Sequence, residues 1–143
     1  MSVFADSSAV VKLYANEADS GVVRALSAMY ISELARVEVA AALWRKHRMG
    51  ELSFADCEVL VDRFRGDFSY EDRPLALVRV STATVDRGEL LVARHRLRAY
   101  DAMQLACAQM VADIDPECAT FCAFDHELRQ AASREGFALL PRS

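Results

Sequence analysis

Short, mainly apolar runs alternate with helical patterns along this chain, and that alternation limits its fold more than any other feature. Strands that are apolar on both faces are typical of parallel sheets with helices on either side. We therefore predict an α/β fold with a central parallel sheet covered on both faces. The runs are SVFA, MYIS, LALVRV, ATFCAF and FALL, at residues 2–5, 29–32, 75–80, 119–124 and 137–140.

The segments between these runs have the apolar spacing of helices. Ser53 can cap one of them, and Gly50 and Gly136 can end two others. Glycine and proline are few, 5 and 3 among 143 residues, which suits short connections within a single domain over 1–143. Helices are expected over 9–15, after 19–20, and over 35–48, 53–68, 82–96, 99–113 and 126–136.

The composition favours a packed cytoplasmic domain. A hydrophobic fraction of 53% excludes a disordered chain. No apolar run approaches the roughly 20 residues that a membrane span needs, and MSVFADSS lacks the basic and apolar regions of a signal peptide. We therefore expect no membrane association, and the 4 cysteines are expected to stay reduced.

Cys118, Cys122 and His126 are evenly spaced, as zinc ligands can be. The two cysteines, however, bracket a predicted strand. At about 3.3 Å per residue they would lie about 13 Å apart, which is too far for one metal ion. We therefore reject a zinc site.

The net charge of −4 argues against a protein held on nucleic acid mainly by a basic surface. It does not exclude a nuclease, because bound cations would neutralise part of the negative charge.

Four acidic residues stand far apart in the sequence, two after predicted strands and two on predicted helices: Asp6, Glu38, Asp101 and Asp125. Asp6 and Asp125 follow predicted strands, and ligands gather at the carboxyl ends of parallel strands. Glu38 and Asp101 lie on strongly apolar helices, where an ionised carboxylate is costly unless something compensates it. Together they predict one pocket that holds a hard divalent cation.

Each acid also has a simpler interpretation. Asp6 and Asp125 can be helix caps, and the helix dipole would favour Asp101 in a first turn. Glu38 can form a salt bridge with a distant arginine. Nearby Glu33 is interpreted only as a carboxylate at a strand-to-helix junction.

Four stretches of the chain, taken together, resemble the PIN-domain family and specifically its VapC-type toxin ribonucleases. They are ADSSAVVKLY, ISELARVEVAAALWR, LRAYDAMQLACA and FCAFDHELRQAA, in the family's order and spanning nearly the whole chain. The resemblance implies a three-layer α/β/α sandwich, PIN-like and Rossmann-like. It also implies that Asp6, Glu38, Asp101 and Asp125 are the catalytic residues and bind Mg²⁺ or Mn²⁺, with Ser8 as the small polar residue beside them.

The activity implied by the resemblance is endonucleolytic cleavage of RNA by a toxin of a type II toxin–antitoxin pair. The implied partners are an RNA substrate and a cognate antitoxin that covers the site, and the implied assembly is a homodimer. Carboxylates that hold Mg²⁺ suit cleavage by a metal-activated water. His47, His95 and His126 share no motif with a nucleophile, so no covalent intermediate is expected.

Candidate substrate contacts are Ser8 and Arg98. Arg98 belongs to a basic cluster with Arg94, His95 and Arg96, which can bind phosphates or complement a helix C-terminus; both interpretations stand. A second cluster over 45–48 is interpreted as a helix C-terminus. Lys12 can face either the cleft or solvent.

Three other classes compete. A haloacid-dehalogenase-type phosphatase needs a second aspartate where this chain has Ser8, and a receiver domain needs paired acids that are missing near Asp6. The stronger alternative is a non-catalytic PIN-like module that binds RNA or protein. Four clustered carboxylates argue against it, because without a cation they repel one another.

Overall fold

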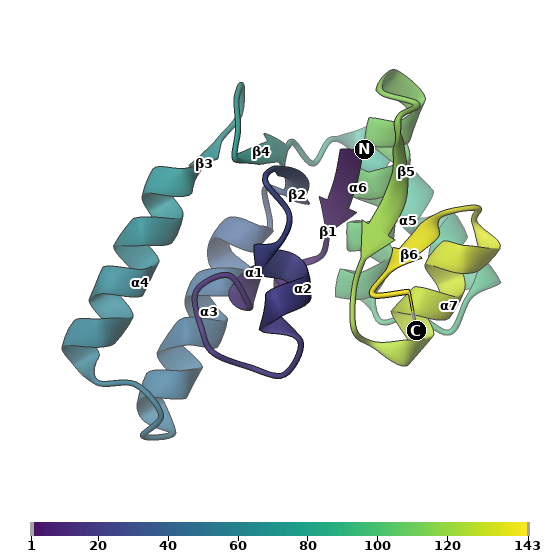
Figure 1. The fold of residues 1–143 in the computed structure, drawn as a ribbon. Helices are drawn as coiled ribbons and strands as arrows, with labels where there is room; N and C mark the ends of the chain where they lie inside the picture. The colour runs from purple at the N-terminus through teal and green to yellow at the C-terminus, as the bar shows by residue number, and fades with distance from the viewer. Residues whose placement is uncertain (1, 143) are drawn as a thin grey trace.

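The computed structural model describes residues 2–142, which contain one six-stranded sheet in the order β3-β4-β2-β1-β5-β6 (Figure 1). Every pairing within it is parallel, which confirms the predicted α/β class. Met1 and Ser143 of the predicted 1–143 domain lie outside the described residues. The strands are β1 (Ser2–Ala5), β2 (Met29–Ser32), β3 (Phe68–Ser69), β4 (Leu75–Val78), β5 (Cys118–Cys122) and β6 (Ala138–Leu140).

Helices cover both faces of the sheet and make three layers, as expected (Figure 1). No helix within residues 2–142 has the length and apolarity to cross a membrane. One face is covered by α1 (Ser7–Val11), α2 (Ser20–Arg24), α3 (Ala35–Arg48) and α4 (Phe54–Asp67). The other is covered by α5 (Thr82–Arg94), α6 (Ala99–Ile114) and α7 (His126–Arg134).

The alternation of side chains along β1 divides the core in two. Val3 and Ala5 pack on the side of α1–α4, whereas Phe4 points to the other side and stacks on Phe121 with 5.6 Å between ring centroids. All of these side chains are buried, and each large one stabilises the fold by about 1.5–3 kcal/mol. Burial on both faces explains why Val3, Phe4 and Ala5 are all apolar.

Several boundaries differ from the sequence prediction, and two of these differences have a clear structural cause. The helix expected to run through Phe68 ends one residue earlier, because Phe68–Ser69 pairs with β4 as a short edge strand. The helix expected over 9–15 begins at Ser7 and ends at Val11. The following amides at Lys12, Leu13 and Tyr14 bond three residues back and continue the chain as turns.

The position of β1 decides where a site can form. It lies between β2 and β5. The helix that follows β1, α1, covers one face of the sheet, whereas the helix that follows β5, α7, covers the other. Such a switch point opens a crevice outside the carboxyl ends of the strands. Asp6 is the first residue after β1 and lies at that crevice.

Candidate metal centre

A cleft of about 540 Å³ lies at the carboxyl end of β1, between α1, α3 and α6. Three of the four predicted acids line it: Asp6, Glu38 and Asp101. These residues are far apart in the chain, and the sheet topology brings them together. Other polar and aromatic residues in the wall are Ser7, Ser8, Arg45, Arg98, Tyr100 and Gln104.

Asp6 is a buried carboxylate at the head of α1, with a relative exposure of only 4%. Its Oδ1 accepts a hydrogen bond from the amide of Ala9 at 2.9 Å, so it is the predicted helix cap. The hydroxyl of Ser8 donates to both carboxylate oxygens. Burial, with a smaller effect from the negative charges of Asp101 and Glu38, raises the pKa of Asp6 to about 7.

Glu38 lies in the first turn of α3 and is tied to two other helices. Its Oε1 accepts hydrogen bonds from Ser7 Oγ and Gln104 Nε2, both at 2.8 Å. Burial raises the pKa of Glu38, although these two hydrogen bonds oppose the shift. No basic residue within 2–142 pairs with it, so the salt bridge considered from the sequence is not formed.

Asp101 lies in the first turn of α6 and faces Arg98, whose Nη2 is 3.3 Å from Oδ2. Burial raises the pKa of Asp101, the positive charge of Arg98 opposes the shift, and the negative charge of Asp125 adds to it. The only ion-pair partner of Asp101 in the described chain is thus an arginine whose own side chain is 81% exposed.

Asp125 lies beside the cleft and is not part of its lining. It is exposed and caps α7 by accepting a hydrogen bond from the amide of Leu128 at 3.0 Å. The simpler interpretation, a helix cap, therefore describes its contacts, while its charge still acts on Asp101. Its role as a fourth cation ligand stays a prediction.

The donor chemistry of the cleft fits a hydrated hard cation. Within residues 2–142, no three Asp, Glu, His or Cys side chains lie close enough to form a ready-made metal cluster. Mg²⁺ does not require one, because it keeps several waters and binds through one or two carboxylates. Asp6 has no basic partner in this part of the chain, and a cation would favour its ionised form.

The basic cluster before Asp101 divides into two parts. Arg94 and His95 both contact Glu135 at the end of α7, at 3.3 and 2.7 Å, and therefore tie α5 to α7. Arg98 alone lines the cleft. The other predicted contact, Ser8, is exposed at the cleft and bonded to Asp6.

Lys12 faces neither the cleft nor open solvent, the two positions considered from the sequence. Its ammonium group lies over the ring of Phe124, donates to the carbonyl of Ala18 and is 3.5 Å from Glu17. Within the second basic cluster, Lys46 pairs with Glu17 at 2.7 Å. Arg45 was interpreted with that helix end, but it lines the cleft.

Sequence reasoning missed Ser7, Tyr100 and Gln104 as residues of the cleft. Ser7 was missed because the segment Asp6-Ser7-Ser8 was interpreted only as a helix cap. Gln104 had a signal, because it is a polar residue within the apolar run of DAMQLACA. Its partners lie 97 and 66 positions away in the sequence, so local spacing could not identify them.

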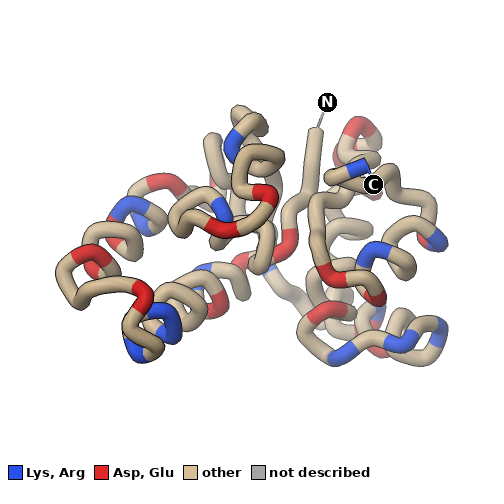
Figure 2. The backbone as a smooth tube through the Cα atoms, turned by 60° about the horizontal axis from the view of Figure 1, so that its bottom comes forward, with Lys and Arg blue, Asp and Glu red and all other residues tan. Residues whose placement is uncertain are grey.

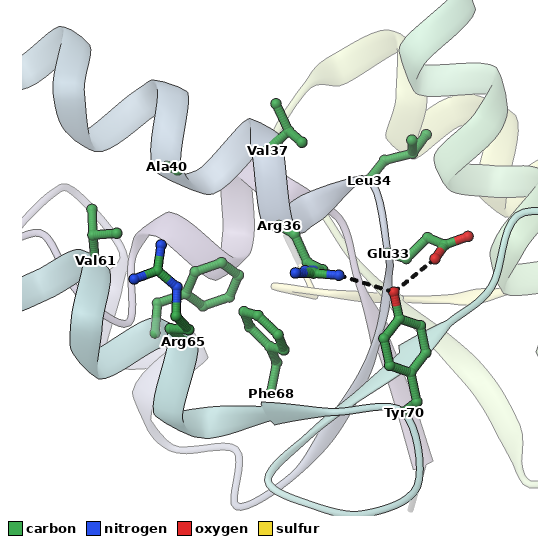
Figure 3. A pocket seen from close by; sticks show the side chains of 10 residues that line it. Glu33, Leu34, Arg36, Val37, Ala40, Val61, Arg65, Phe68 and Tyr70 are labelled. Atoms are coloured by element: carbon green, nitrogen blue, oxygen red, sulfur yellow. Dashed lines mark hydrogen bonds between the residues drawn. The ribbon is translucent and has the colours of Figure 1, made fainter.

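A second hollow, of about 350 Å³, lies between α3 and α4 (Figure 3). Val37 belongs to its lining and to the lining of the cleft. We call this hollow the α3–α4 groove. Its apolar lining includes Val61 and Phe68, and Tyr70 closes one end by bonding to Glu33 and Arg36. Glu33 also accepts from the amide of Val80, so it is structural, as interpreted from the sequence.

Comparison with known proteins agrees with this architecture. The family model described as the PIN domain matches residues 3–133. The chain therefore belongs to the PIN-domain family.

Two relatives in this family are the ribonucleases VapC45 and VapC49 of Mycobacterium tuberculosis, from strains CDC 1551 / Oshkosh and ATCC 25618 / H37Rv. Each is 40% identical over 119 residues, which cover 78% of this chain and 77% of the relative. The crystal structure of VapC20 from the same species, described as a sarcin-ricin loop cleaving toxin, matches with a TM-score of 0.64. It shares 17% identity and covers 94% of this chain and 95% of its own, which supports the fold alone.

Proposed function

We propose that this protein is a metal-dependent endoribonuclease and acts as the toxin of a type II toxin–antitoxin pair. The observation that carries the proposal is the cleft that gathers Asp6, Glu38 and Asp101 in a chain 40% identical to two VapC ribonucleases. These side chains, with Asp125 beside them, would hold Mg²⁺ or Mn²⁺. A bound cation of this kind polarises a phosphate and lowers the pKa of a water molecule.

The chain's own residues prepare the cleft for this chemistry. Ser8 and the amide of Ala9 fix the rotation of the Asp6 carboxylate. Arg98 and Arg45 line the same cleft and can hold the phosphates on either side of the scissile bond. Tyr100 is 61% exposed at the rim, where an unpaired base can stack on its ring.

Hydrolysis without a covalent intermediate agrees with the positions of the histidines. His47 Nδ1 bonds to the carbonyl of Leu52, and His95 Nε2 to Glu135. His126 is the first residue of α7, as predicted. No hydrogen bond within residues 2–142 joins a histidine to a serine or cysteine, so water is the nucleophile we propose.

RNA binding in this proposal is local to the cleft. Figure 2 shows basic and acidic residues interspersed along the backbone. With a net charge of −4, the protein has no general attraction for polyanions. A target recognised through an accessible single-stranded loop suits such a surface.

The partner we propose is a cognate antitoxin whose segment covers both hollows. A basic side chain would enter the cleft among the carboxylates, because a bidentate arginine satisfies carboxylates in the place of a cation. Its apolar residues would lie in the α3–α4 groove, which shares the lining residue Val37 with the cleft. A cytoplasmic location and a homodimeric assembly complete the proposal.

Incubation of the purified protein with RNA in Mg²⁺, Mn²⁺ or EDTA tests the proposed activity. Internal cleavage is expected with either cation and is expected to stop in EDTA. RNA binding without cleavage under all three conditions would favour the alternative, a non-catalytic PIN-like binding module.

A further inference from the structure

A buried amide, Gln104, reaches the wall of the cleft from α6 and contacts residues of two other helices. It is only 2% exposed, and its Nε2 lies 3.0 Å from Ser7 Oγ and 2.8 Å from Glu38 Oε1. Ser7 Oγ donates to the same carboxylate oxygen at 2.8 Å. One oxygen of Glu38 is therefore held from both α1 and α6.

The hydrogen-bonding roles in this trio are fixed by chemistry. A carboxylate oxygen only accepts, so the NH₂ side of the Gln104 amide must face Glu38. Ser7 has one proton, which it gives to Glu38, and it accepts from Gln104 through a lone pair. The network thus has one consistent arrangement of donors and acceptors.

This arrangement has a cost that an apolar side chain would avoid. Gln104 Oε1 is buried and has no hydrogen-bond partner within residues 2–142. Leaving a buried acceptor unpaired is unfavourable. Ala108, one turn further along α6, is a fully buried apolar residue, so a methionine or leucine would suit the same helix face. The presence of an amide at this position is therefore best explained by the hydrogen bonds that its NH₂ group donates to Ser7 and Glu38.

The bonds to Glu38 leave half of the carboxylate free. Both hydrogen bonds that Glu38 accepts from described residues use Oε1, and none uses Oε2. Two donors on one oxygen fix the rotation of the carboxylate. Residues behind a metal ligand typically orient it in this way.

We infer that Gln104 and Ser7 are positioning residues, which hold Glu38 so that its second oxygen is available to a divalent cation. The inference rests on the proposed function, in which Glu38 is a cation ligand. Neither residue touches the reacting atoms in this account. Their effect on cleavage passes through the affinity and placement of the cation.

Calorimetric titration of the full-length protein with Mn²⁺ tests the inference directly. Gln104→Met keeps the length of the side chain and removes its donor. We expect it to raise the Kd for Mn²⁺ about 10-fold, the lower end of the effect of removing such supporting residues. Ser7→Ala should act in the same direction, and it gives a second variant if Gln104→Met does not fold.

Gln109→Met is the matched control. Gln109 lies on the same helix and makes the same kind of bond, from Nε2 to Glu135 Oε1 at 2.9 Å, on the side of α7. Its substitution should leave the Mn²⁺ affinity unchanged. In the Glu38→Gln background, Gln104→Met should change the remaining Mn²⁺ affinity less than about twofold, because its target is gone.

Melting in EDTA separates positioning from packing. A positioning role predicts a melting temperature for Gln104→Met close to that of the wild type, with the weaker Mn²⁺ binding described above. A lower melting temperature with unchanged Mn²⁺ affinity would overturn the inference and leave the proposed metal site intact. A wild-type protein that binds no Mn²⁺ would instead overturn the metal site itself, and the inference with it.

Discussion

Arg98 and Asp101 form an ion pair across the first turn of α6, with 3.3 Å between Nη2 and Oδ2. The arginine side chain is 81% exposed and the aspartate side chain 17%. Both residues line the cleft, so the arginine charge lies beside Asp101 within it. In our account it competes with a cation for Asp101 and also contacts the phosphates of RNA.

Replacing Arg98 by alanine should change these two properties in opposite directions. Mn²⁺ should bind up to about fivefold more tightly, since an exposed ion pair contributes at most about 1 kcal/mol. RNA should bind more weakly, with a higher KM. Titration with Mn²⁺ and cleavage kinetics measure the two effects. Arg94→Ala removes the same charge beside Glu135 and should change neither; equal effects of both variants would contradict a specific role for Arg98.

The metal-free protein should lose stability as the pH rises towards neutrality. The pKa of Asp6 is raised from 3.8 to about 7 in the folded state, mainly by burial. Between these values the folded state binds a proton that the unfolded state has lost, so the free energy of unfolding falls with rising pH. Asp6→Asn should flatten this dependence, because asparagine does not titrate and still caps a helix.

Urea unfolding in EDTA at several pH values between 4 and 8 measures this difference. At neutral pH the variant should be at least as stable as the wild type. A variant with the same pH dependence as the wild type would show that the Asp6 carboxyl is not the group responsible.

Divalent cations should stabilise the wild type. Ligand at about 100 times its Kd adds about 2.7 kcal/mol to the free energy of unfolding. For a chain of this length, that corresponds to a rise in melting temperature of about 5–10 °C. Glu38→Gln and Asp101→Asn should reduce the rise. A melting curve that does not move in millimolar Mn²⁺ would count against the site.

The sequence was sufficient to predict the parallel sheet and its helices, because continuous apolar strands and helical spacing are local patterns. It also singled out Asp6, Glu38 and Asp101, which line one cleft in the structure, since carboxylates after a strand or on an apolar helix stand out locally. Their role as cation ligands stays a prediction. The edge strand at Phe68 was missed because a residue with helical spacing from Phe64 also pairs well in a strand.

The hydrogen-bond network within the cleft could not be predicted from the spacing of residues in the sequence. Gln104 contacts Ser7 and Glu38 only because α1, α3 and α6 meet after folding. Likewise, Arg94 and Arg98 belong to one basic cluster in the sequence, yet α5 ends between them and they serve different partners. Such outcomes depend on long-range packing.

Filling the α3–α4 groove should weaken binding of the proposed antitoxin. Ala40 lines this groove and is absent from the lining of the cleft. Ala40→Lys should weaken antitoxin binding at least about 10-fold, because a charged chain would occupy an apolar contact, while RNA cleavage continues. Ala93→Lys, on the exposed face of α5, is the matched control. Unchanged inhibition of the Ala40 variant would place the antitoxin elsewhere.

Because we propose that the antitoxin inserts a basic residue among the carboxylates, it should compete with the metal ion. Raising Mg²⁺ should weaken inhibition, and so should replacing the inserted arginine by alanine, because peptide and cation share the same carboxylates. Cleavage assays at a fixed antitoxin concentration and increasing Mg²⁺ measure this. Inhibition that is indifferent to Mg²⁺ would argue against insertion at the cleft.

RNA cleavage by Asp6→Asn and Asp101→Asn, compared with the wild type in Mg²⁺, tests the central claim most directly. Each change removes one negative charge with almost no change in volume, so the fold should persist, as circular dichroism can verify. We predict that each variant loses at least about 100-fold in cleavage rate, because a cation ligand is lost. Near-wild-type cleavage by either folded variant would contradict the claim that these carboxylates form the catalytic metal site.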